Sequence, residues 1–541
     1  MRGYRALKQS DQLIRITEVK EALANTRLAG DNACASVQLF GAALKNAELI
    51  VRQYLMVRAG NNDFNKSLLS AIGRKGAVVH PLPPEWRTVI ERQGFKVARV
   101  RSAVAWNVFV GLMLGYGLFS LLKRIGSDVR AVMAPRPALG RYAYFDSLST
   151  GNLPQVGATG RSHNIIEWYQ QWPDRTSGLD SICHGVPGVT RRVLEDFPVI
   201  PLPSAIPPLG RLRALLGYTG WGAGAGLLAL VDLLRGNWWH ALLLNEAVKS
   251  ASVRLQNPDK LARDYLFHNS GWIYRPLWSY EAEAKGSRVI FYFYSTNCEG
   301  FKRPTGYPIQ AHCWQLMNWP LYLVWDKAQA DFVRRAVGQG PAIRVVGPIL
   351  FHAVEAEELP SLNRASVAVF DITPVRESIY VTLGADLEYY VPAVCIEFLR
   401  DIQLVAEAQG LLMHWKHKRK LQNASRAHPM YRGFVATVVE RDNVRLIDAD
   451  LSATLVISTS AAVISMPFTS TAIIAREMNK PTCYYDPTGL LQKDDRAAHG
   501  IEIISGREEL ARWLCSAARA SGQTTPGSGL KDRPKAAGLV G

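Results

Sequence analysis

Apolar residues recur three and four positions apart over the first part of the chain. This spacing predicts amphipathic helices around residues 14–24 and 33–55. An uncharged apolar stretch then runs over residues 104–122. Residues 1–128 are therefore predicted to form a mostly helical region that ends in an apolar segment.

The pattern changes at Val129, where short apolar or β-branched runs begin to alternate with longer helical segments. The runs are VRAVMAP at 129–135, RYAYFD at 141–146, RVIFYFYST at 288–296, LYLVWD at 321–326 and AIRVVGPIL at 342–350. Such alternation is typical of a parallel sheet covered by helices. We predict a Rossmann-like domain over residues 129–350, with an apolar insertion at 214–231.

A second α/β domain is predicted over residues 366–515, after Gly347-Pro348 and an acidic segment without regular periodicity. Strands are expected at 367–372, 411–415, 444–447, 454–457, 462–465 and 482–485, with helices around 388–408, 429–440 and 469–478. The predicted fold class is thus α/β, with two doubly wound, Rossmann-like domains. Residues 516–541 are rich in Gly, Pro and Ser, and we expect a disordered tail there.

The apolar stretches 104–122 and 214–231 allow three interpretations. Each approaches the length that crosses a bilayer, but basic residues on both sides give no positive-inside asymmetry, which disfavours two true spans. We expect them to lie peripherally or monotopically on the anionic surface of the inner membrane, where arginines pair with lipid phosphates. Burial as two core helices of a large α/β protein is the alternative.

The composition and the N-terminal residues indicate the net charge of the protein and the compartment in which it is expected. Lys+Arg minus Asp+Glu is 63 − 46 = +17, which favours an anionic partner. Seven dispersed cysteines without a CxxC spacing indicate neither a zinc module nor a disulfide framework. The charged N-terminus lacks the apolar core of a secretory signal, so a cytoplasmic location is expected. Nucleic acid is not an expected partner, because the basic run near residue 418 lacks interleaved aromatic residues.

The segment 461–487 holds the leading candidate for an anion site. A predicted strand ends at Ser465, the chain turns at Pro467, and Thr469, Ser470 and Thr471 open the next helix. Hydroxyl groups and free helix N–H groups at the carboxyl end of a parallel strand form an arrangement that binds phosphate. A simple helix cap is the alternative.

Other candidate nucleotide-binding residues belong to the same domain. Lys416, Lys418 and Arg419 follow a predicted strand, and His428 precedes a proline at the entry to the next helix. A solvated loop is the alternative for this basic run, and a cap or turn is the alternative for His428. Asp486 ends the last predicted strand, where it could meet a ribose hydroxyl or cap a turn.

Six strings along the chain resemble one known family. They are HPLPPEWRTVIERQGF (80–95), FYFYSTNCEGF (291–301), MNWPLYLVWDKAQADF (317–332), RVVGPILF (344–351), VFDITPVR (369–376) and ISMPFTSTAIIAREMNKPTCYYDP (464–487). The chain resembles the bacterial polysaccharide biosynthesis proteins named for a PFTS motif. That resemblance implies a GT-B-type glycosyltransferase, with two Rossmann-like domains facing a cleft. Such an enzyme transfers a sugar from a nucleotide donor to a surface glycan or its lipid-linked precursor.

The donor is expected to be linked to CMP. His428-Pro429 and Thr469-Ser470-Thr471 are similar to motifs with which bacterial GT-B sialyltransferases, ulosonic-acid transferases and polyol-phosphate transferases hold cytidine nucleotides. Thr469-Ser470-Thr471 departs from the sialyltransferase pattern, which has two serines at the second motif. An ulosonic acid is still the favoured sugar, and a UDP-sugar is the main rival. A CDP-polyol phosphotransferase and a non-catalytic membrane scaffold are alternative functions.

Neither a metal nor a cofactor is expected. No DxD motif lies between residues 129 and 365, where a metal-dependent GT-A enzyme would carry it. The basic cluster and the helix start can instead stabilise the leaving phosphate.

Glycosyl transfer needs a carboxylate or histidine as base if the enzyme inverts, or a carboxylate nucleophile if it retains, and in a two-domain transferase this group should come from the first domain. Carboxylates near predicted strand ends there are Glu299, Asp146, Asp174 and Asp326. Glu299 is the first choice, because it lies in a polar loop after a long apolar strand. For each of the four, a surface or structural role is the alternative.

Overall fold

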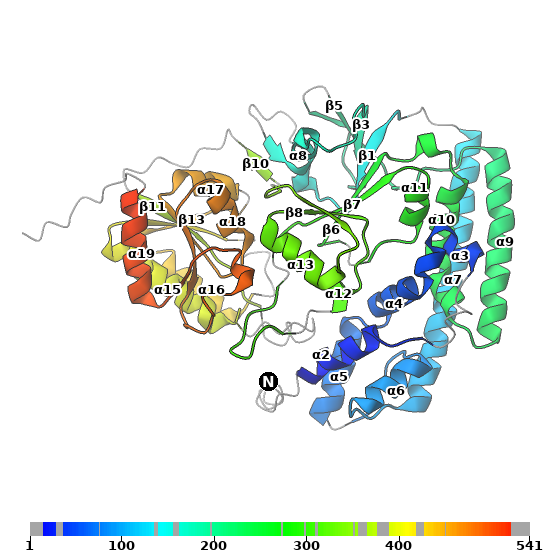
Figure 1. The fold of residues 1–541 in the computed structure, drawn as a ribbon, viewed down its shortest axis with the longest axis horizontal. Helices are drawn as coiled ribbons and strands as arrows, with labels where there is room; N and C mark the ends of the chain where they lie inside the picture. Colours follow the sequence, from blue (N-terminus) through cyan, green and yellow to red (C-terminus); the bar gives the residue numbers. More distant parts are fainter. Residues whose placement is uncertain are drawn as a thin grey trace, which may run out of the picture. The chain divides into compact units, whose positions relative to one another are not determined.

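The structure is a computed structural model of the chain, and its parts are drawn in Figure 1. It describes residues 14–28, 36–74, 76–134, 139–154, 162–194, 197–271, 274–296, 299–308, 312–349, 352–354, 365–375, 389–417, 427–449 and 451–520. The chain divides into two compact units. Unit 1 comprises Met1–Gly300, Tyr307–His352 and Glu377–Leu387, and unit 2 comprises Phe301–Gly306, Ala353–Arg376 and Glu388–Gly541.

Unit 1 begins with the predicted helical region. The α-helices of this unit are α2 (Ile14–Ala24), α3 (Val37–Phe40), α4 (Ala47–Arg58), α5 (Asn62–Arg74), α6 (Pro84–Arg92), α7 (Arg99–Met133), α8 (Ile165–Gln171), α9 (Leu212–Leu234), α10 (Trp239–Leu255), α11 (Trp278–Ala284), α12 (His312–Gln315) and α13 (Lys327–Val337). The strand predicted from Val129 is wrong, because Val129–Met133 is the last part of α7. The buried carboxylate of Asp128 pairs with Arg124 one turn earlier and accepts a hydrogen bond from the Leu209 N–H (3.1 Å), which holds this part of the helix.

The sheet of unit 1 is doubly wound. Its strands are β1 (Tyr142–Phe145), β3 (Ser181–His184), β4 (Arg192–Leu194), β5 (Phe197–Pro201), β6 (Asp264–His268), β7 (Arg288–Tyr292), β8 (Leu321–Val324) and β9 (Ala342–Val345), and β2 (Ser162–Asn164) and β10 (His352–Val354) are short separate strands. The order is β4-β5-β3-β1-β6-β7-β8-β9, parallel except for β4. The winding reverses between β1 and β6. Ligands of such sheets bind at the carboxyl ends of the strands at this switch point.

Unit 2 repeats this topology in a smaller sheet. Its strands are β11 (Ser366–Phe370), β12 (Leu412–Lys416), β13 (Val444–Ile447), β14 (Ala462–Ser465), β15 (Thr482–Asp486) and β16 (Ile503–Ser505), in the order β13-β12-β11-β14-β15-β16, and its helices are α15 (Pro392–Ala408), α16 (Pro429–Val438), α17 (Ala453–Thr459), α18 (Ser470–Glu477) and α19 (Arg507–Ala520). All pairs are parallel, and the winding reverses between β11 and β14. The predicted fold class, two doubly wound α/β domains with a helical N-terminal region, is confirmed.

Three details of the second domain differ from the prediction, and the first is β16, a strand that was not predicted. The β-branched run 454–457 lies in α17, because the Ser452 side chain accepts a hydrogen bond from the Thr454 N–H (3.2 Å) and starts a helix there. Residues 516–520 continue α19 rather than beginning a tail. Residues 521–541 lie outside the described residues.

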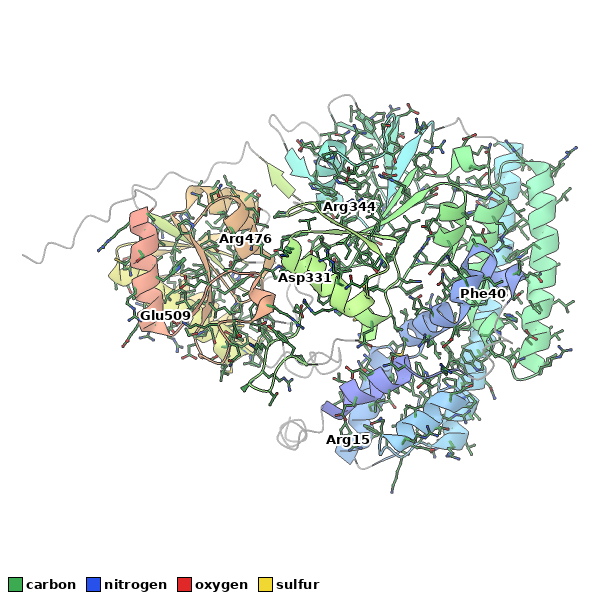
Figure 2. The ribbon with its side chains drawn as sticks, in the orientation of Figure 1. Arg15, Phe40, Asp331, Arg344, Arg476 and Glu509 are labelled. Atoms are coloured by element: carbon green, nitrogen blue, oxygen red, sulfur yellow. The ribbon has the colours of Figure 1, made fainter. Side chains whose placement is uncertain are left out.

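The two apolar stretches form neighbouring helices with a wide exposed face. α7 and α9 both pack on α10 and on each other, and a Cβ at Gly222 of α9 would lie 2.6 Å from the Leu121 side chain of α7. Only about a third of the apolar window of each helix is buried. Figure 2 shows side chains of α9 projecting outward from unit 1. Large apolar side chains on the exposed faces include Val104, Val108, Leu112, Phe119 and Leu122 of α7 and Leu216, Leu227, Leu230 and Leu234 of α9. This exposure argues against burial of the stretches as core helices.

Candidate functional site

The turn after β14 lies at the switch point of unit 2. The Met466 N–H donates to the Phe370 carbonyl at the end of β11 (2.8 Å), so the turn adjoins the residue that follows β11, Asp371. Phe468 has φ +62°, a left-handed conformation that non-glycine residues seldom adopt. The Tyr390 hydroxyl donates to the Pro467 carbonyl (2.8 Å) and the Tyr484 hydroxyl to the Thr469 carbonyl (2.9 Å). These bonds hold a strained turn in one conformation.

The hydroxyl groups at the start of α18 bond to one another and to the turn. Thr469 Oγ1 donates to the Met466 carbonyl (2.8 Å) and lies 3.3 Å from Thr471 Oγ1, which lies 2.9 Å from Ser465 Oγ. Thr469 occupies the N-cap position, yet its side chain accepts no hydrogen bond from the first turn of the helix. Its hydroxyl is therefore not a simple cap. The positive end of the helix dipole faces the strand ends without a side-chain cap at the N-cap position.

A buried His–Asp pair stands on the neighbouring strands. Asp371 follows β11 and His417 follows β12, and both are less than 5% exposed. His417 Nδ1 lies 3.6 Å from Asp371 Oδ1, and the Tyr431 hydroxyl of α16 donates to Asp371 Oδ2. Burial, followed by the Asp371 charge, raises the pKa of the Tyr431 hydroxyl well above its ordinary value. The Tyr431 hydroxyl therefore stays protonated and acts as a donor to Asp371.

Neither ring nitrogen of His417 has a hydrogen-bond partner among the described residues, and the same holds for Asp371 Oδ1. A buried polar atom without a partner costs about 1–3 kcal/mol, so such atoms usually face a ligand or a water. Sequence reasoning included His417 in the basic run but did not select it, and it missed Asp371. A polar residue directly after the first strand of a Rossmann-like domain, here in VFDIT, was the available signal.

The other predicted basic residues are only partly placed. Lys416 ends β12, and its Nζ donates to the Ala449 carbonyl just beyond β13 (2.9 Å). His428 caps α16, since its Nδ1 accepts from the Met430 N–H (3.3 Å), and its backbone N–H donates to the Pro374 carbonyl (3.0 Å). His428 thus lies beside the segment that leaves β11. Lys418 and Arg419 lie outside the described residues.

In unit 1 the switch point carries Asp146 and His268. Asp146 follows β1, and its N–H donates to the Leu266 carbonyl of β6 (3.0 Å). Ser147 Oγ donates to Asp146 Oδ1 (2.5 Å), and His268 Nε2 donates to the Ser147 carbonyl (3.2 Å). Burial lowers the pKa of His268, which favours the neutral ring. A Cβ at Gly271 would lie 2.9 Å from the Ser147 side chain, so the loops after β1 and β6 touch only because residue 271 is glycine.

One family model matches residues 222–514, more than half of the chain, and its description is polysaccharide biosynthesis PFTS motif protein. The chain belongs to this family. The family motif is the turn described above, Pro467 to Ser470, which we call the PFTS turn. No curated protein matches the chain.

Several solved structures are similar to the chain at low identity. They include a UDP-forming α,α-trehalose-phosphate synthase from Burkholderia xenovorans (11% identity, TM-score 0.36, covering 71% of this chain and 93% of that one), the glycosyltransferase SnogD from Streptomyces nogalater (11%, 0.31, 71% and 94%) and the wall teichoic acid polymerase TagF (9%, 0.34, 75% and 91%). Scores this low carry no information on substrate or mechanism.

The remaining carboxylates predicted for unit 1 have structural partners. The side chain of Glu299 is only 4% exposed and forms an ion pair with Arg335 of α13, so its carboxylate is already engaged. Asp326 caps α13 by accepting from the Gln329 N–H (2.9 Å). The Asp174 carbonyl accepts from Arg288, the first residue of β7 (2.7 Å), so Asp174 lies toward the amino ends of the strands. Asp146 is the predicted candidate that the structure places at the switch point.

Asp486 is fully buried beside the PFTS turn, and it has the structural role. Its carboxylate accepts four hydrogen bonds, from the Tyr389 hydroxyl, the Thr488 N–H and hydroxyl, and the Leu491 N–H. All these partners belong to unit 2. The carboxylate thus caps the turn after β15, which leaves little capacity for a ribose hydroxyl.

We expect Asp486→Asn to destabilise the protein by about 2 kcal/mol, because an amide NH2 must then face the N–H of Leu491 or the N–H and hydroxyl of Thr488. Urea unfolding measures this loss, and the exposed Asp442→Asn is the control. Nucleotide affinity of the folded variant should stay at the wild-type level. A selective loss of affinity without a loss of stability would assign Asp486 to the ligand instead.

Proposed function

We propose that the chain is a glycosyltransferase of polysaccharide biosynthesis that binds a nucleotide-activated sugar at the carboxyl edge of the unit 2 sheet. The observation that carries the proposal is the meeting of three groups at neighbouring strand ends. These are the PFTS turn after β14, Asp371 after β11, and the buried, unpartnered His417 after β12. A ligand at this edge would supply the missing partner of His417.

The donor phosphate is the part of the ligand that these groups suit best. The N-terminus of α18 offers N–H groups and the hydroxyls of Ser470 and Thr471, and such helix starts bind anions. In its imidazolium form His417 carries an N–H on both nitrogens: Nδ1, 3.6 Å from Asp371 Oδ1, would form an ion pair with that carboxylate, and Nε2 would donate to a phosphate oxygen. The contacts of the α18 N-terminus and of His417 with the phosphate strengthen as negative charge develops on this leaving group, so they accelerate transfer. Lys416 and His428 border the same edge.

For the donor we propose a CMP-linked sugar, with an ulosonic acid as the favoured group and a UDP-sugar as the rival. The support is the order of motifs in unit 2, in which His428-Pro429 precedes the hydroxyl-rich helix start. A monophosphate leaving group needs few cationic partners, which fits one helix terminus and one imidazolium. Metal independence is part of the proposal.

Unit 1 would bind the acceptor and supply the base. Asp146 is half-buried at the switch point, and its Oδ1 already accepts a hydrogen bond from Ser147. A carboxylate in that place can take the proton of an acceptor hydroxyl as the glycosidic bond forms. The acceptor would be a glycan or a lipid-linked glycan.

A cytoplasmic position on the inner membrane completes the proposal. The exposed faces of α7 and α9 carry large apolar side chains, and Arg99, Arg101, Lys123, Arg211 and Arg213 flank them. Apolar surface with basic ends suits the interface of an anionic leaflet. There the protein would meet a lipid-linked acceptor.

The proposed function is tested by incubating the protein and its host membranes with CMP-, CDP- and UDP-activated donors and analysing the product. A glycoside with release of CMP supports the whole proposal. A phosphodiester product would instead show a polyol-phosphate transferase, and the absence of any transfer would favour a scaffold.

We expect Asp146→Asn to lower the turnover number at least about 100-fold with little change in nucleotide affinity, because the acceptor loses its base. Glu299→Gln is the matched comparison and should have a much smaller effect, since Glu299 is engaged with Arg335. Steady-state rates at saturating donor measure both. If Glu299→Gln lowers the turnover number more than Asp146→Asn does, Glu299 is the base instead.

A further inference from the structure

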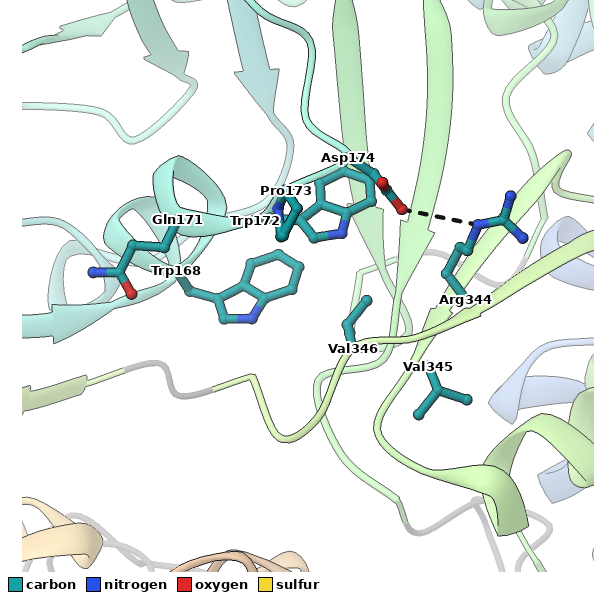
Figure 3. A pocket seen from close by; sticks show the side chains of 8 residues that line it. All are labelled: Trp168, Gln171, Trp172, Pro173, Asp174, Arg344, Val345 and Val346. Atoms are coloured by element: carbon teal, nitrogen blue, oxygen red, sulfur yellow. Dashed lines mark ion pairs between the residues drawn. The ribbon is translucent and has the colours of Figure 1, made fainter.

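A hollow of about 490 Å³ lies on unit 1 beside the end of α8 (Figure 3). Its lining includes Trp168, Trp172, Asp174, Arg344, Val345 and Val346. None of its residues takes part in the donor site of unit 2.

Two indole rings form one side of the hollow. Trp168 and Trp172 are one helical turn apart, and their rings are nearly parallel, with centroids 6.1 Å apart and planes at 9°. Trp172 is 6% exposed and lies under the Arg288 guanidinium, 5.5 Å from its ring centroid. Trp168 is only half-buried and lines the hollow. The buried ring thus supports the more accessible one.

An ion pair stands beside the indoles. Arg344 Nε lies 3.9 Å from Asp174 Oδ2, and both side chains are more than half exposed. Figure 3 shows this pair next to the Trp172 ring, with Val346 between Trp168 and Arg344. The pair presents N–H donors and carboxylate acceptors side by side with no net charge. Neutral hydroxyl groups suit such a pair better than a phosphate does.

We propose that this hollow binds sugar rings of the glycan acceptor. The C–H face of a sugar ring carries partial positive charge and packs on the electron-rich face of Trp168, while Asp174 and Arg344 bind its hydroxyls. The inference rests on the proposed function, because it names where a part of the acceptor chain remote from the reacting hydroxyl is held: Asp174 lies toward the amino ends of the strands, whereas Asp146 lies at their carboxyl ends. It also gives Asp174 a role in binding rather than as a base.

The test uses the native glycan, whatever its sugars are. A photo-crosslinking benzophenone amino acid replaces Gln171, an exposed residue that lines the hollow, in host cells that make their own polysaccharide. The same amino acid in place of the exposed Arg92 of α6 is the control. After irradiation the purified protein is hydrolysed and analysed for covalently attached monosaccharides.

Carbohydrate should attach at position 171 and not at position 92. Trp168→Ala should lower the yield about tenfold and Trp168→Tyr should preserve most of it, because an aromatic face is what the sugar needs. Adducts without carbohydrate, or an unchanged yield in Trp168→Ala, would overturn the inference.

Nucleotide binding, measured separately, distinguishes a failure of the acceptor hollow from a failure of the proposed donor site. Captured carbohydrate without nucleotide binding would refute the donor proposal alone, and nucleotide binding without captured carbohydrate would refute the hollow alone.

Discussion

Replacing His417 by glutamine should remove most of the nucleotide affinity of unit 2. The buried ring has its Nδ1 3.6 Å from Asp371 Oδ1, and neither ring nitrogen has a hydrogen-bond partner among the described residues. A hydrogen bond to a charged group contributes about 2 kcal/mol, so the dissociation constant should rise roughly thirtyfold. Titration calorimetry with the nucleotide that binds the wild type measures this change.

His414→Gln is the matched control for that experiment. His414 is a buried histidine of β12, three residues before His417, which follows the strand; an odd spacing in extended chain places the two side chains on opposite faces. Its replacement should leave affinity within about threefold of the wild type, since it removes no phosphate contact. Equal losses in the two variants, or affinity retained in folded His417→Gln, would remove His417 from the donor site.

The double variant Leu112→Glu/Phe119→Glu should no longer bind membranes. Both side chains are more than 60% exposed on the face of α7, seven residues apart and therefore on one side of the helix. A carboxylate in an apolar layer costs about 2.5–3.5 kcal/mol, and two should reduce binding more than 100-fold. Flotation with phosphatidylethanolamine–phosphatidylglycerol vesicles measures the bound fraction.

A control with the same charge change separates the apolar face from net charge. Val193→Glu/Leu490→Glu alters one exposed apolar residue of β4 and one of unit 2, and it should bind vesicles almost as the wild type does. Because arginines flank the face, wild-type binding should also weaken when phosphatidylglycerol is omitted. Membrane binding that survives the α7 substitutions would contradict the monotopic interface.

Strand positions were predictable where a short apolar run stood between clear turns. The predicted bounds 444–447 and 462–465 coincide with β13 and β14. The run 454–457 has the same β-branched composition, but a serine cap two residues before it starts a helix. The β propensity of the residues could not distinguish a strand from a helix here, because the Ser452 cap and the tertiary packing determined that 454–457 is helical. The strands that were missed include β3, β4, β5, β6 and β16, each only three to five residues long.

The PFTS turn was predictable from the sequence, but the residues that lie beside it were not. The turn at Pro467 and the hydroxyls of α18 follow from adjacent residues, whereas the approach of His417 to Asp371 joins residues 46 positions apart (417 − 371 = 46). The Glu299–Arg335 ion pair was equally invisible in the sequence, because it depends on how α13 packs against a loop. The sequence shows which side chains could act in catalysis or binding, and the packing of the fold determines which of them are already engaged in structural contacts.

Thermal stabilisation of the detergent-purified chain by CMP, CDP, UMP, UDP, GDP and ADP tests the donor site most directly, with Ser470→Ala measured in parallel. A cytidine nucleotide at 100 times its dissociation constant should stabilise the wild type by about 2.7 kcal/mol, and the variant should lose much of this shift. Stabilisation by UDP alone would support the glycosyltransferase proposal and contradict the proposal that the donor is linked to CMP. If no nucleotide stabilises the wild type, the proposed donor site at the PFTS turn is contradicted.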